Sequence, residues 1–376
     1  MPAIPAVPGT GVLRAPGELL DRVRRDVERN ALRARNGLKM AAGIDRPELG
    51  QSPKDLVWSS GRCELWRYRN DAVTLSPPLV IVFSLVSRSY VLDLRPGNSF
   101  VEHLMSAGFD VFVIDFAPAD ERHADERLED HADEYIPEAV RQTCLAAGTD
   151  SVSLLGYCFG GVLALLYGAH HPDAPLRSFS VMATPVDFSN LGLWTEMTKD
   201  GRIDLDAVID ETGNVPPGVI RQAFKLMKPT GEVRQYATLL DNVWNDEYVT
   251  AYQAMTTWSN DHVPFPGAAA RQSLDMLVRD NAFMNDSVRL DGDRVSLRDI
   301  RWPTLTVIAE RDHIVPEPSA APLPDLLTGA EENDVLRLRA GHIGLVVGRT
   351  AAKVTIPRII EFLQRRSDPV AGQEVA

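Results

Sequence analysis

Cys158 stands in the glycine-flanked stretch Gly-Tyr-Cys-Phe-Gly-Gly, residues 156–161. The apolar run 152–156 before it predicts a strand, and residues 162–171 after it predict a helix. A sharp strand-to-helix turn with glycine on both sides exposes the central side chain at the end of a sheet. The pattern therefore predicts a nucleophile elbow that carries cysteine where serine is usual. The alternative is a buried, inert thiol in a glycine-rich turn.

A nucleophilic thiol needs a base that makes it a thiolate and a third group that orients the base. In proteins with a nucleophile elbow, an acid and then a histidine follow the nucleophile along the chain, each after a later strand. Asp312 follows the apolar run 304–310, and His342 follows the run 334–340. We therefore predict a triad of Cys158 as nucleophile, His342 as base and Asp312 as its partner.

Two residues compete for these roles. His313 also follows the run 304–310, but adjacent side chains diverge, so Asp312 cannot easily orient it. We prefer His342 as the base and assign His313 to the pocket wall. Asp187, after the preceding strand, is the alternative acid in a variant arrangement.

Backbone N–H groups should stabilise the oxyanion that forms during acyl transfer. The oxyanion of an acyl transfer should be held by the N–H of Phe159, directly after the nucleophile, and by an N–H near Val86 and Ser87, in the loop after an earlier strand. The acidic run 119–134 contains two histidines but lacks the spacing of a zinc or calcium site, so no metal is predicted. His170-His171 ends the helix after the elbow, where the helix dipole favours cations, and receives no other role.

Six short apolar runs would position these residues. Separated by helical segments, they predict a parallel sheet covered on both faces, hence an α/β protein of the α/β-hydrolase arrangement. The runs are 79–86, 109–116, 151–156, 176–184, 304–310 and 334–340. The alternation breaks at 186–302, which we predict to be a mostly helical cap inserted above the carboxyl ends of the strands. The predicted parts are an N-terminal extension and helix at 1–50, a core at 51–185 plus 303–376, and the cap.

Composition limits the partners and the compartment. The net charge of −13 argues against a nucleic-acid partner, because phosphate binding needs a basic face. Three cysteines are too few for a disulfide framework. The N-terminus lacks the pattern of an export signal, and no run of about 18 apolar residues occurs. We expect a cytoplasmic protein without a transmembrane segment.

With these residues placed, the chain resembles polyhydroxyalkanoate synthases over nearly its full length. Several segments look like family segments in family order: 52–69, 78–96, 108–115, 154–161, 182–188, 213–220, 312–316 and 340–348. The length, the short N-terminus and the Gly-His-Ile-Gly ending at 341–344 are similar to the class III catalytic subunit. The resemblance implies that Cys158 carries the acyl group, with His342 as base and Asp312 as its partner.

The resemblance also implies the substrates, partners and location. The substrate would be an (R)-3-hydroxyacyl-CoA and the growing polyester, with no cofactor beyond the CoA that the substrate carries. We expect a homo-oligomer that works with an accessory synthase subunit at the surface of polyester granules. Three positions depart from the family: Ser87 stands where asparagine is usual, Phe159 where glutamine is frequent, and Phe116 where tryptophan is common. These residues are candidates for shaping the pocket and the substrate range.

Two other functions stay open on the sequence. The first is a cysteine-type hydrolase, such as a thioesterase, an intracellular polyester depolymerase or a lactone hydrolase, with the same triad in a wetter pocket. The second is a non-catalytic, granule-associated protein that has kept the fold. The intact set of Cys158, Asp312 and His342 favours an enzyme, and an acyltransferase that makes polyhydroxyalkanoate is the function we predict.

Overall fold

The structure is a computed structural model that describes residues 16–192, 195, 204–227 and 231–370. By its internal contacts the chain divides into two compact units. One unit comprises Met1–Pro47 and Glu232–Ala254, and the other comprises Glu48–Gly231 and Met255–Ala376.

The larger unit is built on an eight-stranded sheet in the order β1-β2-β5-β4-β6-β7-β12-β13. β2 pairs antiparallel with β1 and with β5, and the other neighbouring strands are parallel. The strands are β1 (Lys54–Ser60), β2 (Cys63–Tyr68), β4 (Leu79–Val82), β5 (Val111–Phe116), β6 (Val152–Tyr157), β7 (Leu176–Met182), β12 (Thr304–Ala309) and β13 (Asn333–Leu338). Each of the six predicted runs coincides with one of these strands to within a few residues at either end, so the predicted α/β-hydrolase fold is confirmed.

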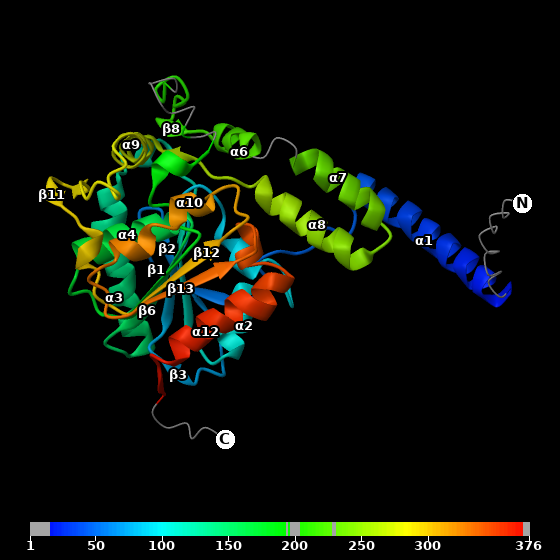
Figure 1. The fold of residues 1–376 in the computed structure, drawn as a ribbon, viewed down its shortest axis with the longest axis horizontal. Coiled ribbons are helices and arrows are strands. Elements are labelled where there is room, and N and C mark those ends of the chain that lie inside the picture. Colours follow the sequence, from blue (N-terminus) through cyan, green and yellow to red (C-terminus); the bar gives the residue numbers. More distant parts are fainter. Residues whose placement is uncertain (1–15, 193–194, 196–203, 228–230, 371–376) are drawn as a thin grey trace, which may run out of the picture. The chain divides into compact units, whose positions relative to one another are not determined.

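Helices cover both faces of this sheet, which explains why its central strands are continuous apolar runs. Figure 1 shows α3 (Ile136–Ala147) and α4 (Phe159–His170) on one side of the sheet, and α2 (Phe100–Ser106) and α12 (Ile356–Gln364) on the other. Every residue of β4, β6 and β12 is buried. Burial of apolar surface at roughly 25 cal/mol per Å² is the main force that holds these layers together.

Helix α4 is apolar around almost its whole circumference, and ten of its twelve residues are buried. It packs on β6, β4 and β7 and on the π-helical segment η3 (Asp130–Tyr135), which leads into α3. A helix that is apolar on all sides belongs in a protein core. Both ends of this buried helix carry polar residues that could do chemistry.

The described part of residues 183–303 contains several helices, and its strands are only two residues long. The helices are α6 (Pro217–Leu226), α7 (Gly231–Asn242), α8 (Asp246–Ser259) and α9 (Gly267–Gln272), with 3-10 or π turns η4 (Phe188–Asn190), η6 (Ser273–Arg279) and η7 (Leu297–Asp299). The short strands form two antiparallel pairs, β8 (Asn214–Val215) with β9 (Phe265–Pro266) and β10 (Arg289–Leu290) with β11 (Asp293–Arg294). The division into extension, core and cap stays a prediction.

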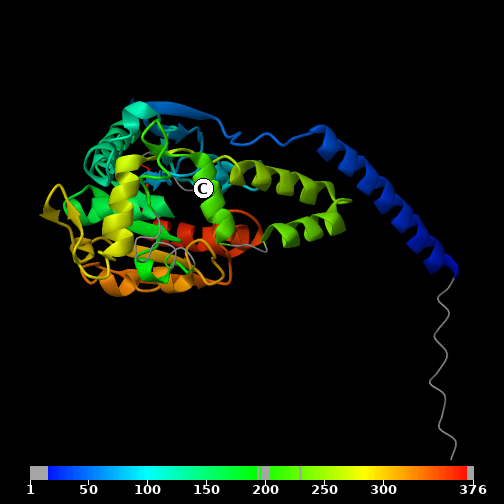
Figure 2. The same cartoon turned by 90° about the horizontal axis from the view of Figure 1, so that it is seen from above.

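The smaller unit consists of helix α1 (Pro16–Ala42) with α7 and most of α8, and Figure 2 shows the short turn that joins α7 to α8. Arg35 donates two hydrogen bonds to the carboxylate of Asp246, at 2.5 and 2.6 Å. Asn36 donates to the Val243 carbonyl at 2.8 Å, and the Arg29 guanidinium lies 4.6 Å from the Trp244 ring. Polar contacts thus hold α1 to the turn between α7 and α8.

The remaining elements are short connections around the sheet. They are η1 (Ser89–Asp93), η2 (Glu121–His123), α10 (Glu317–Ala320), α11 (Leu323–Leu326), η8 (Ile343–Leu345), η9 (Ala351–Thr355), and the pair β3 (Leu75–Ser76) with β14 (Asp368–Pro369). Among the described helices, none combines the length and the apolar character needed to cross a membrane.

Candidate active site

Cys158 occupies a strained turn between β6 and α4. Its φ of 57° and ψ of −125° lie in a region that side-chain-bearing residues rarely adopt. Backbone hydrogen bonds hold it on both sides: its N–H donates to the Met182 carbonyl, and its carbonyl accepts from Gly161 N–H, each at 2.9 Å. Such strain persists only where the surrounding structure over-determines the conformation, and it concentrates at functional sites. The predicted elbow geometry is present at Cys158.

Two glycines after Cys158 let the helix begin this close to the sheet. A Cβ atom on Gly160 would lie 2.2 Å from the Val82 carbonyl oxygen, and one on Gly161 would lie 1.9 Å from Oγ1 of Thr184. Neither distance is compatible with a side chain. Gly160 therefore allows the first turn of α4 to pack directly on the end of β4, from which the loop containing Val86 departs, and Gly161 allows it to pack on Thr184, just after β7.

His342 and Asp312 form a buried hydrogen-bonded pair. Nδ1 of His342 lies 2.6 Å from Oδ2 of Asp312, and the two side chains are 4% and 0% exposed. The other carboxylate oxygen accepts from the N–H groups of Ile314 and Val315, at 2.8 and 2.9 Å. The turn after β12 thus fixes the carboxylate, and the carboxylate fixes the imidazole ring, as the base of a triad requires.

The surroundings of His342 favour its protonated form. Burial by itself lowers the pKa of the ring. The charges and hydrogen bonds of Asp312 and Cys158 raise it by more than burial lowers it, so the pKa of His342 is about 10. The interaction with Cys158 shows that the three residues predicted as a triad lie together in the structure. An imidazole between a carboxylate and a sulfur can accept the thiol proton and stabilise the resulting ion pair.

The structure separates the two competitors from this pair. The carboxylate of Asp187 accepts from the backbone N–H of Ser189 at 3.0 Å and from the Asn281 amide at 2.9 Å, so it closes its own turn. His313 is partly buried next to Asp312, but the Asp312 carboxylate is paired with His342. The pocket role of His313 stays a prediction.

The expected oxyanion donors lie on two elements that meet at the elbow. Phe159 is the first residue of α4, and the N–H groups of a first helical turn have no acceptor within their own helix. Val86 lies in the loop after β4, and its N–H is 3.4 Å from Oγ of Ser84, a long contact. The Val86 carbonyl accepts from the N–H of Val263 at 3.4 Å and lies 3.1 Å from Nδ1 of His262.

The pocket candidates have different surroundings. Ser87 is 9% exposed and forms an isolated β-bridge with His262. The Phe159 ring meets the Phe265 ring edge-on, with centroids 5.6 Å apart. Phe116 is part of the buried hydrophobic core, and its ring centroid lies 5.1 Å from that of the His131 ring. Their effect on substrate range stays a prediction.

Tyr157 is a further residue of this site, which the sequence analysis did not single out. Its side chain is 1% exposed, its hydroxyl donates to the His342 carbonyl at 3.2 Å, and its ring centroid lies 5.1 Å from that of His342. Burial raises the pKa of the Tyr157 hydroxyl well above its usual value, so it stays a donor. Its place directly before Cys158 was the available signal, because that position lies at the end of β6.

The chain was compared with protein-family models, with solved structures and with curated protein sequences. No protein-family model matches the chain. Among solved structures, a hydrolase from Pseudomonas aeruginosa PA01 covers 84% of this chain and 99% of its own, at 17% identity and a TM-score of 0.49. An esterase from Thermogutta terrifontis covers the same shares at 16% identity and a TM-score of 0.45.

Curated relatives match over most of the sequence. The poly(3-hydroxyalkanoate) polymerase subunit PhaC of Allochromatium vinosum is 33% identical over 340 residues, which are 88% of this chain and 93% of the relative. The protein of that name from Haloferax mediterranei is 31% identical over 339 residues, which are 88% of this chain and 68% of the relative. Identity at this level over nearly the whole chain shows that the protein belongs to the poly(3-hydroxyalkanoate) polymerase family.

Proposed function

We propose that the chain polymerises (R)-3-hydroxyacyl units from their CoA thioesters into polyhydroxyalkanoate and releases CoA. The observation that carries the proposal is the hydrogen-bonded pair of His342 and Asp312 beside Cys158 on its strained turn, in a member of the polymerase family. Cys158 would be the nucleophile, His342 the general base and acid, and Asp312 the residue that orients and stabilises His342.

The first half-reaction would load the enzyme. His342 accepts the proton of Cys158, and the thiolate attacks the carbonyl carbon of the thioester. The backbone N–H groups of Phe159 and Val86 would stabilise the tetrahedral oxyanion. The carbon–sulfur bond to CoA then breaks, and the departing thiolate takes the proton from His342. The products are free CoA and an acyl group on Cys158.

The second half-reaction would lengthen the chain. His342 removes the proton from the 3-hydroxyl of the next unit or of the growing polyester, and that oxygen attacks the acyl group on Cys158. One ester bond forms, and the Cys158 sulfur leaves and is reprotonated. A cysteine suits this cycle because exchange between two thioesters is nearly isoenergetic, which keeps driving force for the ester that follows.

Water exclusion separates this polymerase from a cysteine hydrolase that has the same triad. Water reaching the acyl group on Cys158 would compete with the 3-hydroxyl and release free hydroxyacid. We therefore propose to give purified protein (R)-3-hydroxybutyryl-CoA and to measure released CoA, free hydroxyacid and polymer mass together. Polymer that accounts for most of the released CoA is the expected result.

Three outcomes of that assay would reject the proposal. Release of CoA with an equal amount of free hydroxyacid and no polymer would assign a hydrolase. Release of CoA that is unchanged in Cys158→Ala would remove the triad from the mechanism, and a wild-type chain without any turnover would favour the granule-associated, non-catalytic alternative.

We further propose that the chain acts as one subunit of a larger polymerase at the surface of polyester granules. The support is that the relatives from Allochromatium vinosum and Haloferax mediterranei are named as polymerase subunits. The expected result is a lag before polymerisation by the purified chain, which shortens when an accessory subunit is added. A lag-free, fully active chain that stays monomeric in light-scattering measurements would contradict both the accessory subunit and the homo-oligomer.

A further inference from the structure

Asp133, His170 and His171 form a cluster at the carboxyl end of α4, whereas the elbow at Cys158 precedes the first residue of this helix. Oδ1 of Asp133 lies 2.7 Å from Nδ1 of His170 and 2.9 Å from Nε2 of His171. Ligand atoms of the three residues lie within 4.8 Å of one another. One carboxylate oxygen is thus shared by two imidazole rings from neighbouring residues.

The backbone explains how adjacent histidines reach the same carboxylate. Successive residues of a regular helix point about 100° apart, because a turn takes 3.6 residues. His170 is the last residue of α4, whereas His171 has left the helix, with φ −119° and ψ 68°. The change of backbone direction turns the second ring toward Asp133, which lies on the π-helical segment η3. Such π-helical segments occur frequently at functional sites.

This cluster has the donor set of a transition-metal site. Two imidazole nitrogens and one carboxylate oxygen suit divalent zinc, cobalt, nickel, copper or iron, whereas calcium and magnesium prefer oxygen ligands alone. The ligand atoms of a tetrahedral zinc site lie about 3.3 Å apart, so small side-chain rotations would open the cluster enough. The carboxyl end of α4 also carries the negative end of its helix dipole, which favours a cation there.

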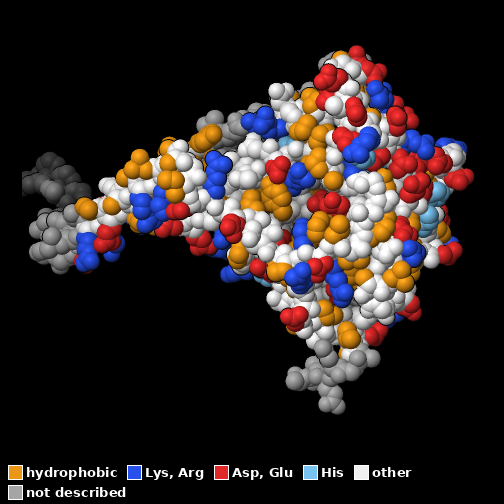
Figure 3. Space-filling model, turned by 180° about the vertical axis from the view of Figure 1, so that it is seen from behind, with side chains coloured by type: hydrophobic (Ala, Val, Ile, Leu, Met, Phe, Trp, Pro, Cys, Tyr) orange, Lys and Arg blue, Asp and Glu red, His pale blue; other side chains and the backbone are white. Residues whose placement is uncertain are grey.

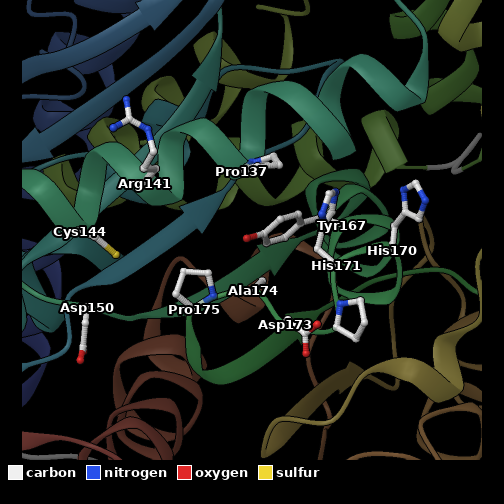
Figure 4. A pocket seen from close by; sticks show the side chains of 11 residues that line it. Pro137, Arg141, Cys144, Asp150, Tyr167, His170, His171, Asp173, Ala174 and Pro175 are labelled. Atoms are coloured by element: carbon white, nitrogen blue, oxygen red, sulfur yellow. The ribbon is translucent and has the colours of Figure 1, made fainter.

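The cluster is accessible to solvent. The side chains of His170, His171 and Asp133 are 24%, 36% and 22% exposed. Both histidines line a cavity of about 560 Å³, and Figure 4 shows them on one wall with Tyr167 beside His171. Water could therefore reach the metal and complete its coordination. In Figure 3, acidic and histidine side chains lie together along one edge of the molecule.

We propose that Asp133, His170 and His171 bind one divalent transition-metal ion and thereby tie η3 to the end of α4. The test titrates zinc into the full, tag-free chain in competition with a chromophoric chelator. The chain should carry Cys158→Ala so that the active-site thiol cannot compete for the metal. One saturable equivalent is expected, with a melting temperature that rises with zinc concentration. Magnesium should not displace the zinc.

Matched variants locate the site. His171→Asn should weaken zinc binding at least about tenfold, because loss of even an outer-shell partner of a metal ligand costs that much. His123→Ala is the control, since His123 also pairs with a carboxylate, that of Asp120 at 2.8 Å, but without a second imidazole. Zinc affinity that is unchanged in His171→Asn, or equally reduced in both variants, would overturn the proposal, as would the absence of saturable binding.

A second, independent set of contacts concerns the loop that carries the proposed oxyanion donor Val86. The end of α8 and the residues after it hold this loop at several points: the indole of Trp258 donates to the Arg88 carbonyl at 2.7 Å, and the Tyr90 hydroxyl donates to Asp261 at 2.9 Å. His262 forms the β-bridge with Ser87 and lies with Nδ1 3.1 Å from the Val86 carbonyl. We call residues 258–263 the strap.

His262 is the strap residue whose side chain contacts the Val86 carbonyl. Burial lowers its pKa, so the ring is neutral near pH 7, and Nδ1 must carry the hydrogen that faces the Val86 carbonyl. Its ring stacks on Phe224 at 5.1 Å and 11°, which fixes its orientation. We infer that His262 is a positioning residue, which holds Val86 so that its N–H faces the oxyanion. This inference rests on the proposed function.

Two variants at one position test this role. His262→Leu removes the donor and should lower kcat about tenfold, part of the roughly 100-fold loss for a missing oxyanion donor, with KM little changed. His262→Asn keeps an N–H donor close to the place of Nδ1 and should restore most of kcat. The exposed Asn260→Ala, in the same turn, is the control and should match wild type.

Failure of the proposed role of His262 can be distinguished from failure of the proposed function. A melting temperature lowered equally in His262→Leu and His262→Asn, with kcat unchanged in both, would show a structural role only and overturn the inference. Wild-type protein that releases CoA without making polymer would instead refute polymerisation, and the dependence of CoA release on His262 would still test the strap.

Discussion

Helix α4 has a histidine–aspartate pair near each of its ends, and the two pairs differ in burial. Near its first residue, His342 and Asp312 are 2.6 Å apart and almost fully enclosed. At its last residue, His170 and Asp133 are 2.7 Å apart and about a quarter exposed. The buried pair faces the thiol of Cys158, whereas the exposed pair shares its carboxylate with a second imidazole, that of His171.

The difference shows that burial and the third partner determine what this pair of side chains can do. In a low-dielectric site, charges interact strongly, so the pKa of His342 rises to about 10 despite burial. At the exposed end, solvent weakens the interaction between the histidine and the aspartate, and the cluster stays open to water. Substitutions at the two ends should therefore affect different quantities.

The largest expected effect is at Cys158, the proposed nucleophile. Cys158→Ala should abolish CoA release, with a loss of about 10⁴-fold or more, because no covalent intermediate can form. Cys158→Ser should also lose most activity, since the pKa of a hydroxyl is far above that of a thiol and His342 activates it poorly. The measurement is CoA release under substrate saturation. Near-wild-type turnover by Cys158→Ser would contradict the mechanism.

Asp312→Asn should lower kcat by roughly 10³- to 10⁴-fold, as loss of the orienting carboxylate does in a well-studied serine triad. The asparagine would keep the size of the side chain but favour the wrong tautomer of His342. Asp187→Asn is the matched control, because Asp187 is bound to Ser189 and Asn281 rather than to the base. If Asp187→Asn were the more damaging change, the acid would have to be reassigned.

The raised pKa of His342 predicts a pH dependence of stability. A group whose pKa is higher in the folded than in the unfolded chain contributes fully below its unfolded value, near 6.5 for histidine. That contribution is lost as pH rises through the folded value of about 10. The stability difference between wild type and His342→Gln, from urea unfolding, should shrink from pH 6.5 to pH 10. A difference that grew over this range would reverse the assigned sign.

Tyr157→Phe should have a smaller effect at the buried end. It removes one hydrogen bond, from the Tyr157 hydroxyl to the His342 carbonyl, and should lower the free energy of unfolding by about 1 kcal/mol. A fall of kcat by a few-fold is expected from looser placement of His342. Urea unfolding and steady-state rates measure the two effects, and a stability equal to that of wild type would show that the hydrogen bond contributes nothing net.

The smallest effect is expected at the exposed end in the absence of metal. Asp133→Asn should lower the free energy of unfolding by about 1 kcal/mol or less, because partly exposed ion pairs contribute little. Metal-free protein with chelator present is the appropriate sample for urea unfolding. A loss of several kcal/mol would show that the two ends of α4 differ less than their burial indicates.

Strands that are buried on both faces could be predicted from the sequence, whereas edge strands could not. β4, β6 and β12 are buried on both faces, so they were visible as apolar runs. β1 and β2 were not predicted: five of the seven residues of β1 are charged or polar or lie exposed at the sheet edge, and the strand shows no continuous apolar run. Antiparallel strands at an edge have weaker hydrophobic patterns than central parallel ones.

The candidate site divides in the same way. The sequence alone predicted the elbow at Cys158, because glycines flank this cysteine within six residues, and it singled out Asp312 and His342 by their order after strands. Only the tertiary structure decided that Asp312 pairs with His342, that Tyr157 supports the His342 backbone, and that Asp133 meets two histidines 37 and 38 residues further along the chain. Contacts between distant residues depend on how the layers pack, and no local pattern encodes that packing.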